Sequence, residues 1–412
     1  MGKEFLNIKD PLEAKKMICD LFEEYYSVDG EFVGLDECVG RILYEDIVSN
    51  VDFPPFNRAL KDGYCVKVED TYGASEESPR VVHIIDTVEA GDFTNKTINN
   101  GECVRISTGA CIPSGGEAVE MVEYSDEDGE GNVSLYSSLT PGEEISLKGS
   151  DIKKGETILC KGDYLTPSRI GVIAGQGFNR VSVYKRPSVG VISTGNELTP
   201  LGESLSEGKI YDINSTMIKS SLNSIGVDCS NLGIIPDEYD LIKNTILDGI
   251  HNHDLVVISG GTSAGIGDNL RSILDELGTV IIHGISVQPG KPTLVGVIND
   301  KLVIGLPGNP VSALIVFNVF ILNYIKNLVG LSDDEEETLT GELIKRIHSA
   351  VGREQYQLVR ITDNGNVEPI FKDSGAIFSL VSADGYVKID KNTEMVLEGE
   401  TVKVKLFYKQ KI

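Results

Sequence analysis

The chain has no tryptophan, only five histidines, and no two cysteines at the spacing of a zinc site or a redox motif. Its seven cysteines, an odd number, lie far apart in the sequence. We therefore expect scattered reduced thiols, which argues against a disulfide framework and against a structural zinc site. His251 and His253 precede an apolar run, and a surface turn is a better interpretation of them than a ligand pair.

Positive charge is also scarce, because 37 Lys and Arg residues face 63 Asp and Glu residues, for a formal net charge of -26. This excess of negative charge disfavours binding to nucleic acid or to an anionic bilayer, so we expect neither nucleic acid nor a membrane as a partner. The one long apolar stretch, 310–329, is interrupted by Asn318, Asn323 and Lys326, which predicts a buried helix. The first residues lack an apolar signal region, which indicates a cytoplasmic protein.

The length of 412 residues and the hydrophobic content of 41% are typical of a soluble chain with roughly three domains. An apolar stripe predicts an amphipathic helix over 10–26. From 46 to 147, short β-branched runs alternate with Gly, Asn, Asp and Ser clusters, which predicts a mostly β region with a hairpin tip at 125–132. A helix-like pattern returns at 167–173.

The region from 185 to 330 alternates apolar strands with helical patterns. This alternation predicts a mainly parallel sheet covered by helices on both faces, an α/β domain. The acidic run 333–337 indicates a solvated boundary, and 341–406 returns to β alternation. The expected strands of the α/β region are 188–193, 228–234, 255–259, 279–285 and 301–304, and its expected helices are 214–224, 239–252, 268–277 and 310–329.

Four unusual loops, 193–198, 259–268, 287–292 and 305–310, follow strands of this sheet. In an open α/β sheet such loops share the edge where ligands bind. The loop 259–268 has four glycines and three hydroxyl residues, so backbone N–H groups stay accessible to an anion. It matches neither the P-loop nor the dinucleotide-binding order. A phosphate or oxyanion cradle and a tight turn with incidental glycines are both open interpretations.

Residues in the other loops and near them also suit an anion site at this edge of the sheet. Asn309 suits a helix N-cap and Pro310 the first helical turn. Lys291, between Gly290 and Pro292, places a positive charge on a stiff loop beside the expected anion site, although it also fits a plain surface lysine. Asp212 and Asp268 are carboxylates that suit Mg²⁺ near a bound phosphate, and Asp268 fits an N-cap equally well.

In their order along the chain, these loops resemble those of the molybdopterin molybdenumtransferases of molybdenum-cofactor synthesis, bacterial and archaeal proteins similar to the gephyrin E domain. The similarity runs from end to end. It includes the segments 52–56, 62–64, 107–110, 112–115, 352–353 and 371–375 as well as the four loops.

The resemblance implies a multidomain fold in which a central three-layer α/β domain, 185–330, follows a β-rich inserted domain, 46–140. It also implies a discontinuous helical or extended N-terminal domain, 1–45 plus 141–184, and a C-terminal β-barrel-like domain, 338–412. The implied reaction converts adenylylated molybdopterin and molybdate or tungstate into molybdenum cofactor, releases AMP and depends on Mg²⁺ or a similar ion. A homodimer, with an active site shared between subunits, and contact with molybdopterin adenylyltransferase are implied as well.

Site residues follow from the resemblance position by position. The nucleotide or pterin phosphate and the metal are assigned to Ser259, Gly260, Gly261, Ser263 and Asp268, with Glu197 and Asp212 nearby. The anion pocket is assigned to Gln288, Lys291, Pro307 and Pro310, with Arg353 and Ser374 from the last domain. The β-rich domain supplies Asn57, Asp62, Thr108 and Glu117.

Three positions depart from the family pattern. Asn57 stands where the family has a catalytic Asp, and an amide can neither take up a proton nor carry a full charge. Gln288 replaces a lysine of many members, and Glu117 replaces Asp with a longer carboxylate. Two alternatives to the transferase therefore stay open: a degenerate paralogue that binds molybdopterin or nucleotide as a scaffold, and a molybdopterin adenylyltransferase.

Overall fold

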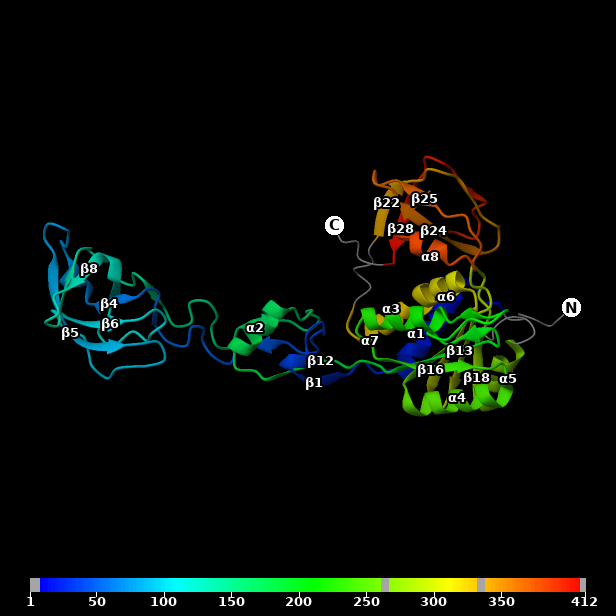
Figure 1. The fold of residues 1–412 in the computed structure, drawn as a ribbon, viewed down its shortest axis with the longest axis horizontal. Helices are drawn as coiled ribbons and strands as arrows, with labels where there is room; N and C mark the ends of the chain where they lie inside the picture. Colours follow the sequence, from blue (N-terminus) through cyan, green and yellow to red (C-terminus); the bar gives the residue numbers. More distant parts are fainter. Residues whose placement is uncertain (1–7, 261–266, 332–337, 408–412) are drawn as a thin grey trace. The chain divides into compact units, whose positions relative to one another are not determined.

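The computed structural model describes residues 8–260, 267–331 and 338–407. Two compact units make up the chain (Figure 1). Unit 1 comprises residues 1–32, 40–44 and 182–412, and unit 2 comprises residues 33–39 and 45–181. Gly261, Ser263, the predicted acidic boundary 333–337 and the side chain of Asp268 lie outside the described residues.

An α/β sheet forms the centre of unit 1, with the strand order β16-β13-β17-β21-β20-β18. The pairs from β16 to β21 are parallel, which confirms the mainly parallel sheet. The sequence prediction missed β20, which pairs antiparallel with both β21 and β18. Asn299 and Asp300, both at positive φ, form the tight turn between β20 and β21. The strands are β13 Val189–Thr194, β16 Cys229–Ile235, β17 Leu255–Ser259, β18 Thr279–His283, β20 Leu294–Ile298 and β21 Lys301–Leu306.

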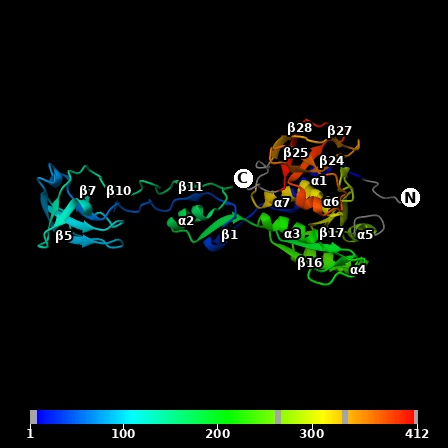
Figure 2. The ribbon, with the colours of Figure 1, turned by 45° about the horizontal axis from the view of Figure 1, so that its top comes forward.

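Helices cover both faces of this sheet (Figures 1 and 2). On one face lie α1 (Pro11–Tyr25), α3 (Asn214–Ser224) and a continuous helix formed by α6 (Pro310–Phe317), η4 (Asn318–Leu322) and α7 (Asn323–Leu328). On the other lie α4 (Tyr239–Asn252) and α5 (Gly267–Leu277). The helix Pro310–Leu328 is long and apolar enough to span a membrane, but 72% of its apolar window is buried in the protein, as predicted.

Helix α1 packs in the core of the α/β domain. Its stripe of Ala14, Ile18 and Phe22 is buried there, and the Phe22 ring stacks on Tyr324 with 5.4 Å between ring centroids. This packing argues against the expected grouping of residues 10–26 with 141–184, because the apolar face of α1 is already covered by the α/β core. The domain boundaries stay a prediction.

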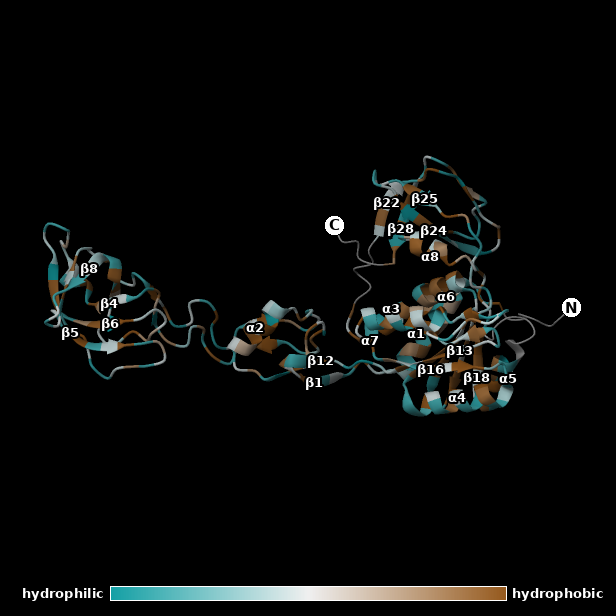
Figure 3. Ribbon diagram, in the orientation of Figure 1, coloured by the Kyte–Doolittle hydropathy of each residue, from teal (hydrophilic) through white to brown (hydrophobic). Residues whose placement is uncertain are grey.

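The C-terminal part of unit 1 is a β domain with its own core. The Val287–Gln288 strand, β19, pairs in parallel with β24 and so joins a loop of the α/β domain to the C-terminal sheet. Figure 3 shows apolar strands inside the α/β sheet and polar residues on the outer side of α4. The C-terminal elements are β22 Thr338–Glu342, β23 Ile347–His348, β24 Glu354–Ile361, β25 Val367–Pro369, α8 Phe378–Ser382, β26 Gly385–Ile389, β27 Met395–Val396 and β28 Thr401–Leu406.

Unit 2 contains a mixed sheet with the order β7-β4-β6-β5-β9-β8. The hairpin of β8 and β9 confirms the predicted tip at 125–132. The helix α2 (Pro167–Gly175) starts at the expected proline. The strands are β2 Ile47–Val48, β3 Arg58–Ala59, β4 Gly63–Val66, β5 Arg80–Val88, β6 Glu102–Ile106, β7 Ala118–Met121, β8 Ser125–Glu127, β9 Asn132–Leu135, β10 Ile145–Ser146 and β11 Thr157–Leu159, and residues of both units form β1 Gly30–Gly34 and β12 Arg180–Tyr184.

Candidate active site

The loops after β13, β17 and β21 meet at one point of the sheet edge. Gly260 donates its N–H to the carbonyl of Leu306 at 3.3 Å. Gly260 has φ of +94°, and a Cβ there would lie 2.3 Å from the carbonyl oxygen of Thr194. The backbones thus approach more closely than any side chain allows, which explains a glycine at this position. We call Thr194, Asn214, Ser259, Gly260 and Gly308 the central rim cluster.

Asn214 holds this cluster together and was not among the predicted site residues. Its Nδ2 donates to Ser259 Oγ and to the carbonyl of Gly308, both at 2.7 Å. Within the described part of the chain, Asn214 Oδ1, Ser193 Oγ and Thr194 Oγ1 are buried and accept or donate no hydrogen bond. Leaving a buried polar atom unsatisfied costs about 1–3 kcal/mol. Such atoms at one sheet edge indicate a place that a ligand or water completes.

Asp212, predicted as a metal ligand, has other partners. Its carboxylate is buried and accepts from the Ser215 N–H at 3.2 Å and from the Ser215 hydroxyl at 2.5 Å. Both oxygens therefore serve the first turn of α3, as in a helix cap. A role as metal ligand stays a prediction for Asp212, and for Asp268 near the start of α5.

Asp237, just after β16, and Glu197, in the loop after β13, are neighbouring carboxylates at the sheet edge. Asp237 exchanges hydrogen bonds with Asn196, and its Oδ1 is buried without a partner among the described residues. Burial raises the pKa of Asp237, and the nearby charge of Glu197 raises it further. The Glu197 carboxylate oxygens fold back to 2.8 Å from where a Cβ of Gly195 would lie. Asp237 was missed, although its position directly after a strand of the predicted sheet was the available signal.

No group of three His, Cys, Asp or Glu side chains is arranged as a metal site among the residues that the structure describes. All seven cysteines are free in the structure. His251 lies in the last turn of α4 and His253 is its C-cap residue. The prediction of a surface turn was therefore wrong, because the helix continues through His251. The His253 Nδ1 is 3.1 Å from the carbonyl of Gly249, as expected for a helix end.

A pocket of about 440 Å³ opens between the loop 287–292, the start of α6 and the C-terminal β domain, and we call it the rim pocket. Gln288, Lys291, Arg353 and Ser374 all line it, so the structure brings together four of the predicted residues from two domains. The backbone holds these loops: Ser286 Oγ donates to the Gly352 carbonyl at 3.0 Å, next to the short pairing of β19 with β24.

The start of α6 completes the rim pocket. Asn309 occupies the N-cap position as predicted, but its amide donates to Ser374 Oγ at 3.1 Å and makes no capping hydrogen bond. The Val311 N–H donates to the Ser374 carbonyl at 3.2 Å. The buried Ser312, in the first turn of α6, lines the pocket and was missed because it lies within an apolar run. Pro307 and Pro310 flank this loop and do not line the pocket.

The rim pocket combines positive groups from separate segments. Lys291, Arg353 and Lys372 line it together with the single carboxylate of Asp373. The N-terminus of α6 adds the positive end of a helix dipole. In a chain of net charge -26, this arrangement can bind an anion because local geometry outweighs the distant charges.

Unit 2 brings Asp62 and Thr108 together. Asp62 Oδ1 accepts from the Thr108 N–H at 2.5 Å and from the Thr108 hydroxyl at 2.7 Å. These two hydrogen bonds lower the pKa of Asp62. The carboxylate is exposed and is thus a fixed negative group at the surface of unit 2.

A separate pocket of unit 2, about 450 Å³, is lined by Asn57 and Glu117. Asn57 Oδ1 accepts from the Lys148 N–H at 2.8 Å, and Glu117 Oε2 accepts from the Val68 N–H at 3.0 Å. Both side chains are therefore positioned by backbone donors. The amide at position 57 uses the same atom that an aspartate would use.

Comparison with known proteins follows the same division of the chain. The sequence profile "MoeA N-terminal region (domain I and II)" matches residues 10–177, "Probable molybdopterin binding domain" matches 190–327, and "MoeA C-terminal region (domain IV)" matches 340–407. A molybdopterin biosynthesis protein of Methanocaldococcus jannaschii is 34% identical over 97% of this chain and 98% of its own length. The chain belongs to the MoeA family.

Other MoeA-family proteins agree with this assignment. The molybdopterin molybdenumtransferase of Staphylococcus epidermidis is 31% identical, with 96% of each chain covered. A solved MoeA protein of Pyrococcus horikoshii is 36% identical and has a TM-score of 0.84 over 98% of this chain and 100% of its own. A second from that organism is 31% identical, with a TM-score of 0.72 over 97% and 100%.

Proposed function

We propose that this MoeA-family protein is a molybdopterin molybdenumtransferase, which inserts molybdate or tungstate into adenylylated molybdopterin and releases AMP. The observation that carries the proposal is the rim pocket, in which Lys291 and Arg353 stand beside the hydroxyl of Ser374 and the start of α6. A tetrahedral dianion needs such a set of cations, hydroxyls and N–H groups. The unsatisfied atoms of the central rim cluster offer the adjoining place for a phosphate or pterin.

Each part has a distinct role in this proposal. Lys291 and Arg353 offset the charge of the oxyanion and keep it close to the reacting group, which lowers the cost of bringing two anions together. Gln288 contributes an amide in place of a charge. The loop after β17 stays the predicted place of the phosphate that leaves with AMP, because its four glycines keep backbone N–H groups accessible.

A magnesium ion fits the carboxylates of the sheet edge better at Glu197 and Asp237 than at Asp212. The Asp237 Oδ1 is buried and unsatisfied among the described residues, whereas both oxygens of Asp212 already accept from Ser215. Mg²⁺ commonly binds through one or two carboxylates plus phosphate oxygens and water. When bound, it supplies positive charge against the phosphates, and Asp268 is the remaining predicted ligand.

We further propose a cytoplasmic homodimer that receives its substrate by contact with molybdopterin adenylyltransferase. The seven free cysteines suit a reducing compartment. The family resemblance predicts that Asp62 and Thr108 of one copy act with the rim pocket of a second copy. Mixing a Lys291→Gln protein with an Asp62→Asn protein then restores activity in heterodimers, and mixtures no more active than either variant contradict a shared site.

One reaction tests the proposed function. Purified protein is incubated with adenylylated molybdopterin and Mg²⁺, with and without molybdate, and AMP release and pterin-bound molybdenum are both measured. We expect AMP release that requires molybdate and is matched by metal insertion. AMP release without molybdate, or molybdate-dependent release without insertion, contradicts the transferase. ATP consumption with molybdopterin identifies an adenylyltransferase instead, although the N-terminal and C-terminal MoeA regions support the transferase.

The scaffold alternative rests on Asn57. Because Asn57 Oδ1 accepts from the Lys148 N–H, an Asn57→Asp substitution keeps the geometry and adds only charge and a titratable proton. We expect at most a small rise in the rate of AMP release. A very large gain from near-zero activity supports the degenerate paralogue.

A further inference from the structure

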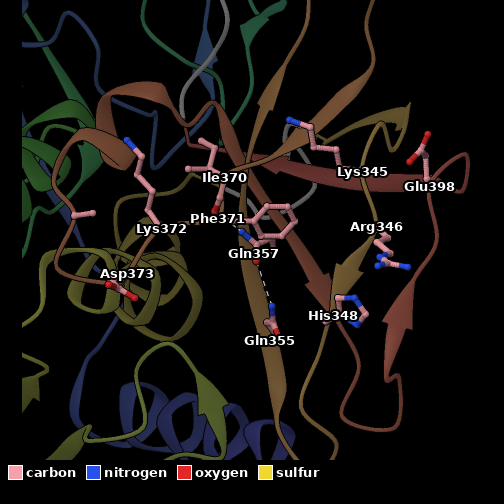
Figure 4. Close-up of a pocket in the computed structure, with 11 residues that line it drawn as sticks. Lys345, Arg346, His348, Gln355, Gln357, Ile370, Phe371, Lys372, Asp373 and Glu398 are labelled. Atoms are coloured by element: carbon pink, nitrogen blue, oxygen red, sulfur yellow. Dashed lines mark hydrogen bonds between the residues drawn. The ribbon is translucent and has the colours of Figure 1, made fainter.

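Gln355 and Gln357 of β24 line two neighbouring cavities, the rim pocket and a larger one of about 1110 Å³ on the C-terminal β domain (Figure 4). Ile370, Lys372 and Asp373 also line both cavities. Neither glutamine was among the predicted site residues. Both nevertheless line the pocket in which the oxyanion is proposed to bind, so the hydrogen bonds of their amides matter for that pocket.

The amide of Gln357 has one preferred orientation. Its Nε2 donates to the carbonyl of Ile370 at 2.7 Å and to the carbonyl of Leu358 at 3.1 Å, so both of its protons are used. Rotating the amide by half a turn would place its oxygen against these two carbonyl oxygens, which would repel it. The Gln357 Oε1 is therefore held in place as an acceptor for a neighbouring donor.

Gln357 in turn orients Gln355. The Gln355 Nε2 donates to Gln357 Oε1 at 3.2 Å, and Figure 4 shows this hydrogen bond between the two side chains of β24. Gln355 is 9% exposed, and its side chain makes no other hydrogen bond with the residues that the structure describes. An amide nitrogen carries two protons, so the second N–H of Gln355 can serve a ligand in the cavities that it lines.

Gln355 is a neighbour of residues that are proposed to hold the oxyanion. Arg353 precedes it by two residues, at the start of β24. In the parallel pairing of β19 with β24, the register partner of Gln355 is Gln288. All three residues line the rim pocket. This pocket therefore has two neutral amides from paired strands beside its cations.

Positive charge alone does not distinguish molybdate from sulfate, because both are tetrahedral dianions. The two anions differ in size, since the Mo–O bond is longer than the S–O bond. The ammonium group of a lysine is carried on a flexible stem and can follow an anion of either size. A donor that is fixed in position meets the narrow distance range of a hydrogen bond for one size of anion only. Selectivity between the two therefore requires a donor of this fixed kind.

We propose that Gln355 is a specificity-determining residue of the rim pocket, whose second N–H donates to an oxygen of molybdate or tungstate. Gln357 is the positioning residue that holds the Gln355 amide for this contact. The inference rests on the proposed function for the identity of the anion. The two glutamines select the larger dianion over sulfate, whereas Lys291 and Arg353 supply the attraction that all such dianions share.

Calorimetric titration of the full chain with sodium molybdate and with sodium sulfate tests this assignment without any turnover. We expect the wild-type protein to bind molybdate more tightly than sulfate. Gln355→Leu should weaken molybdate binding about fivefold, the effect of one neutral hydrogen bond, and leave sulfate binding nearly unchanged. Gln357→Leu should have the same effect, because Gln355 then loses the acceptor that orients it.

Two further variants separate selectivity from charge and from folding. Lys291→Gln should weaken the binding of both anions by a similar factor, because it removes a charge that acts on both. Gln176→Leu removes a buried glutamine of unit 2 that accepts from the Ser49 hydroxyl at 2.6 Å, and should leave both affinities at the wild-type value. Because two anions are compared in one protein, a smaller folded fraction lowers the number of sites for both and leaves the ratio of their affinities unchanged.

The outcomes for Gln355 are distinguishable from those for the proposed function. Equal affinity of the wild-type protein for the two anions, or unchanged or equally reduced affinities in Gln355→Leu, overturns the assignment even if the protein releases AMP with molybdate. A loss of selectivity in Gln355→Leu without molybdate-dependent AMP release by the wild-type protein supports the assignment and contradicts the transferase. Unchanged selectivity in Gln357→Leu shows that Gln357 does not position Gln355.

Discussion

Asn214 Nδ2 lies 2.7 Å from both Ser259 Oγ and the carbonyl oxygen of Gly308, so one amide ties the loops after β17 and β21 to the start of α3. We expect Asn214→Ala to lower the free energy of unfolding by about 1–3 kcal/mol, because the buried hydroxyl of Ser259 and the partly buried carbonyl of Gly308 lose their donor. The same substitution should reduce AMP release. Urea denaturation measures the first effect. Asn252→Ala, which removes an exposed amide at the end of α4, is the matched control, and equal effects of both substitutions contradict the role of Asn214.

Gly260 and Gly308 make a second matched pair. A Cβ at Gly260 lies 2.3 Å from the Thr194 carbonyl oxygen at a φ of +94°, whereas a Cβ at Gly308 has ordinary contact, 3.8 Å from the nearest atom. Gly260→Ala should cost about 1–2 kcal/mol from the backbone conformation alone, plus the displacement of β13. Gly308→Ala should unfold at nearly the wild-type urea concentration. Equal stability of the two proteins in that titration shows that the close approach at Gly260 is not required.

The pKa of Asp62 should depend on Thr108. The Thr108 N–H and hydroxyl both donate to the carboxylate and hold its pKa below the usual value. The lowered pKa means that the ionised form contributes stability above the unfolded pKa, and that this contribution is lost as pH falls through the folded pKa. Thr108→Val removes the hydroxyl and should raise the pKa of Asp62, while Thr108→Ser should restore it. Carboxyl NMR titration measures the shift, and identical titration of the Val variant contradicts this account.

Much of the fold follows from local sequence patterns. Strands β13 and β17 are continuous apolar runs, buried on both faces, and α3 and α4 have the bounds that their apolar periodicity predicts. The strand β20 was missed because no helix separates it from β21, to which a tight turn connects it. Its Asn299-Asp300 turn is the signal that would have identified it.

The residues of the candidate site are harder to predict from local sequence patterns. Lys291 was predicted from its loop, but Arg353 and Ser374 came only from the family resemblance, because the pairing of β19 with β24 is a long-range register. Asn214 and Ser312 lie within helices and look like ordinary helix residues in the sequence. Their importance comes from what they face across the fold, which spacing along the chain does not encode.

The folded state of unit 2 should lose stability at alkaline pH. Burial raises the pKa of Tyr64 to about 12, with a further contribution from its hydrogen bond to Glu127, and burial raises the pKa of Cys65 and of Cys103 to about 12. In the unfolded chain these groups ionise at 10.0 for tyrosine and 9.0 for cysteine. The stability they contribute is therefore complete below about pH 9 and is lost as pH rises toward about 12.

Urea denaturation of the full chain at about pH 8 and about pH 11 measures this loss of stability. Tyr64→Phe removes one of the ionising groups, so its stability should fall less between the two pH values than that of the wild-type protein. Tyr164→Phe, which changes an exposed tyrosine of the same unit, should keep the wild-type dependence. A pH dependence that is the same in all three proteins shows that Tyr64 does not ionise with the predicted cost.

The dependence of AMP release on molybdate concentration, in the wild-type protein and in Lys291→Gln, tests the central claim most directly. The account predicts saturable release by the wild-type protein and a half-saturating molybdate concentration about tenfold higher or more in Lys291→Gln, because a charged hydrogen-bond donor is lost from the rim pocket. Lys403→Gln, which changes an exposed lysine of β28 that does not line the rim pocket, should match the wild-type protein. AMP release that does not depend on molybdate, or the same half-saturating concentration in the wild-type and Lys291→Gln proteins, would contradict the assignment of the rim pocket to the oxyanion.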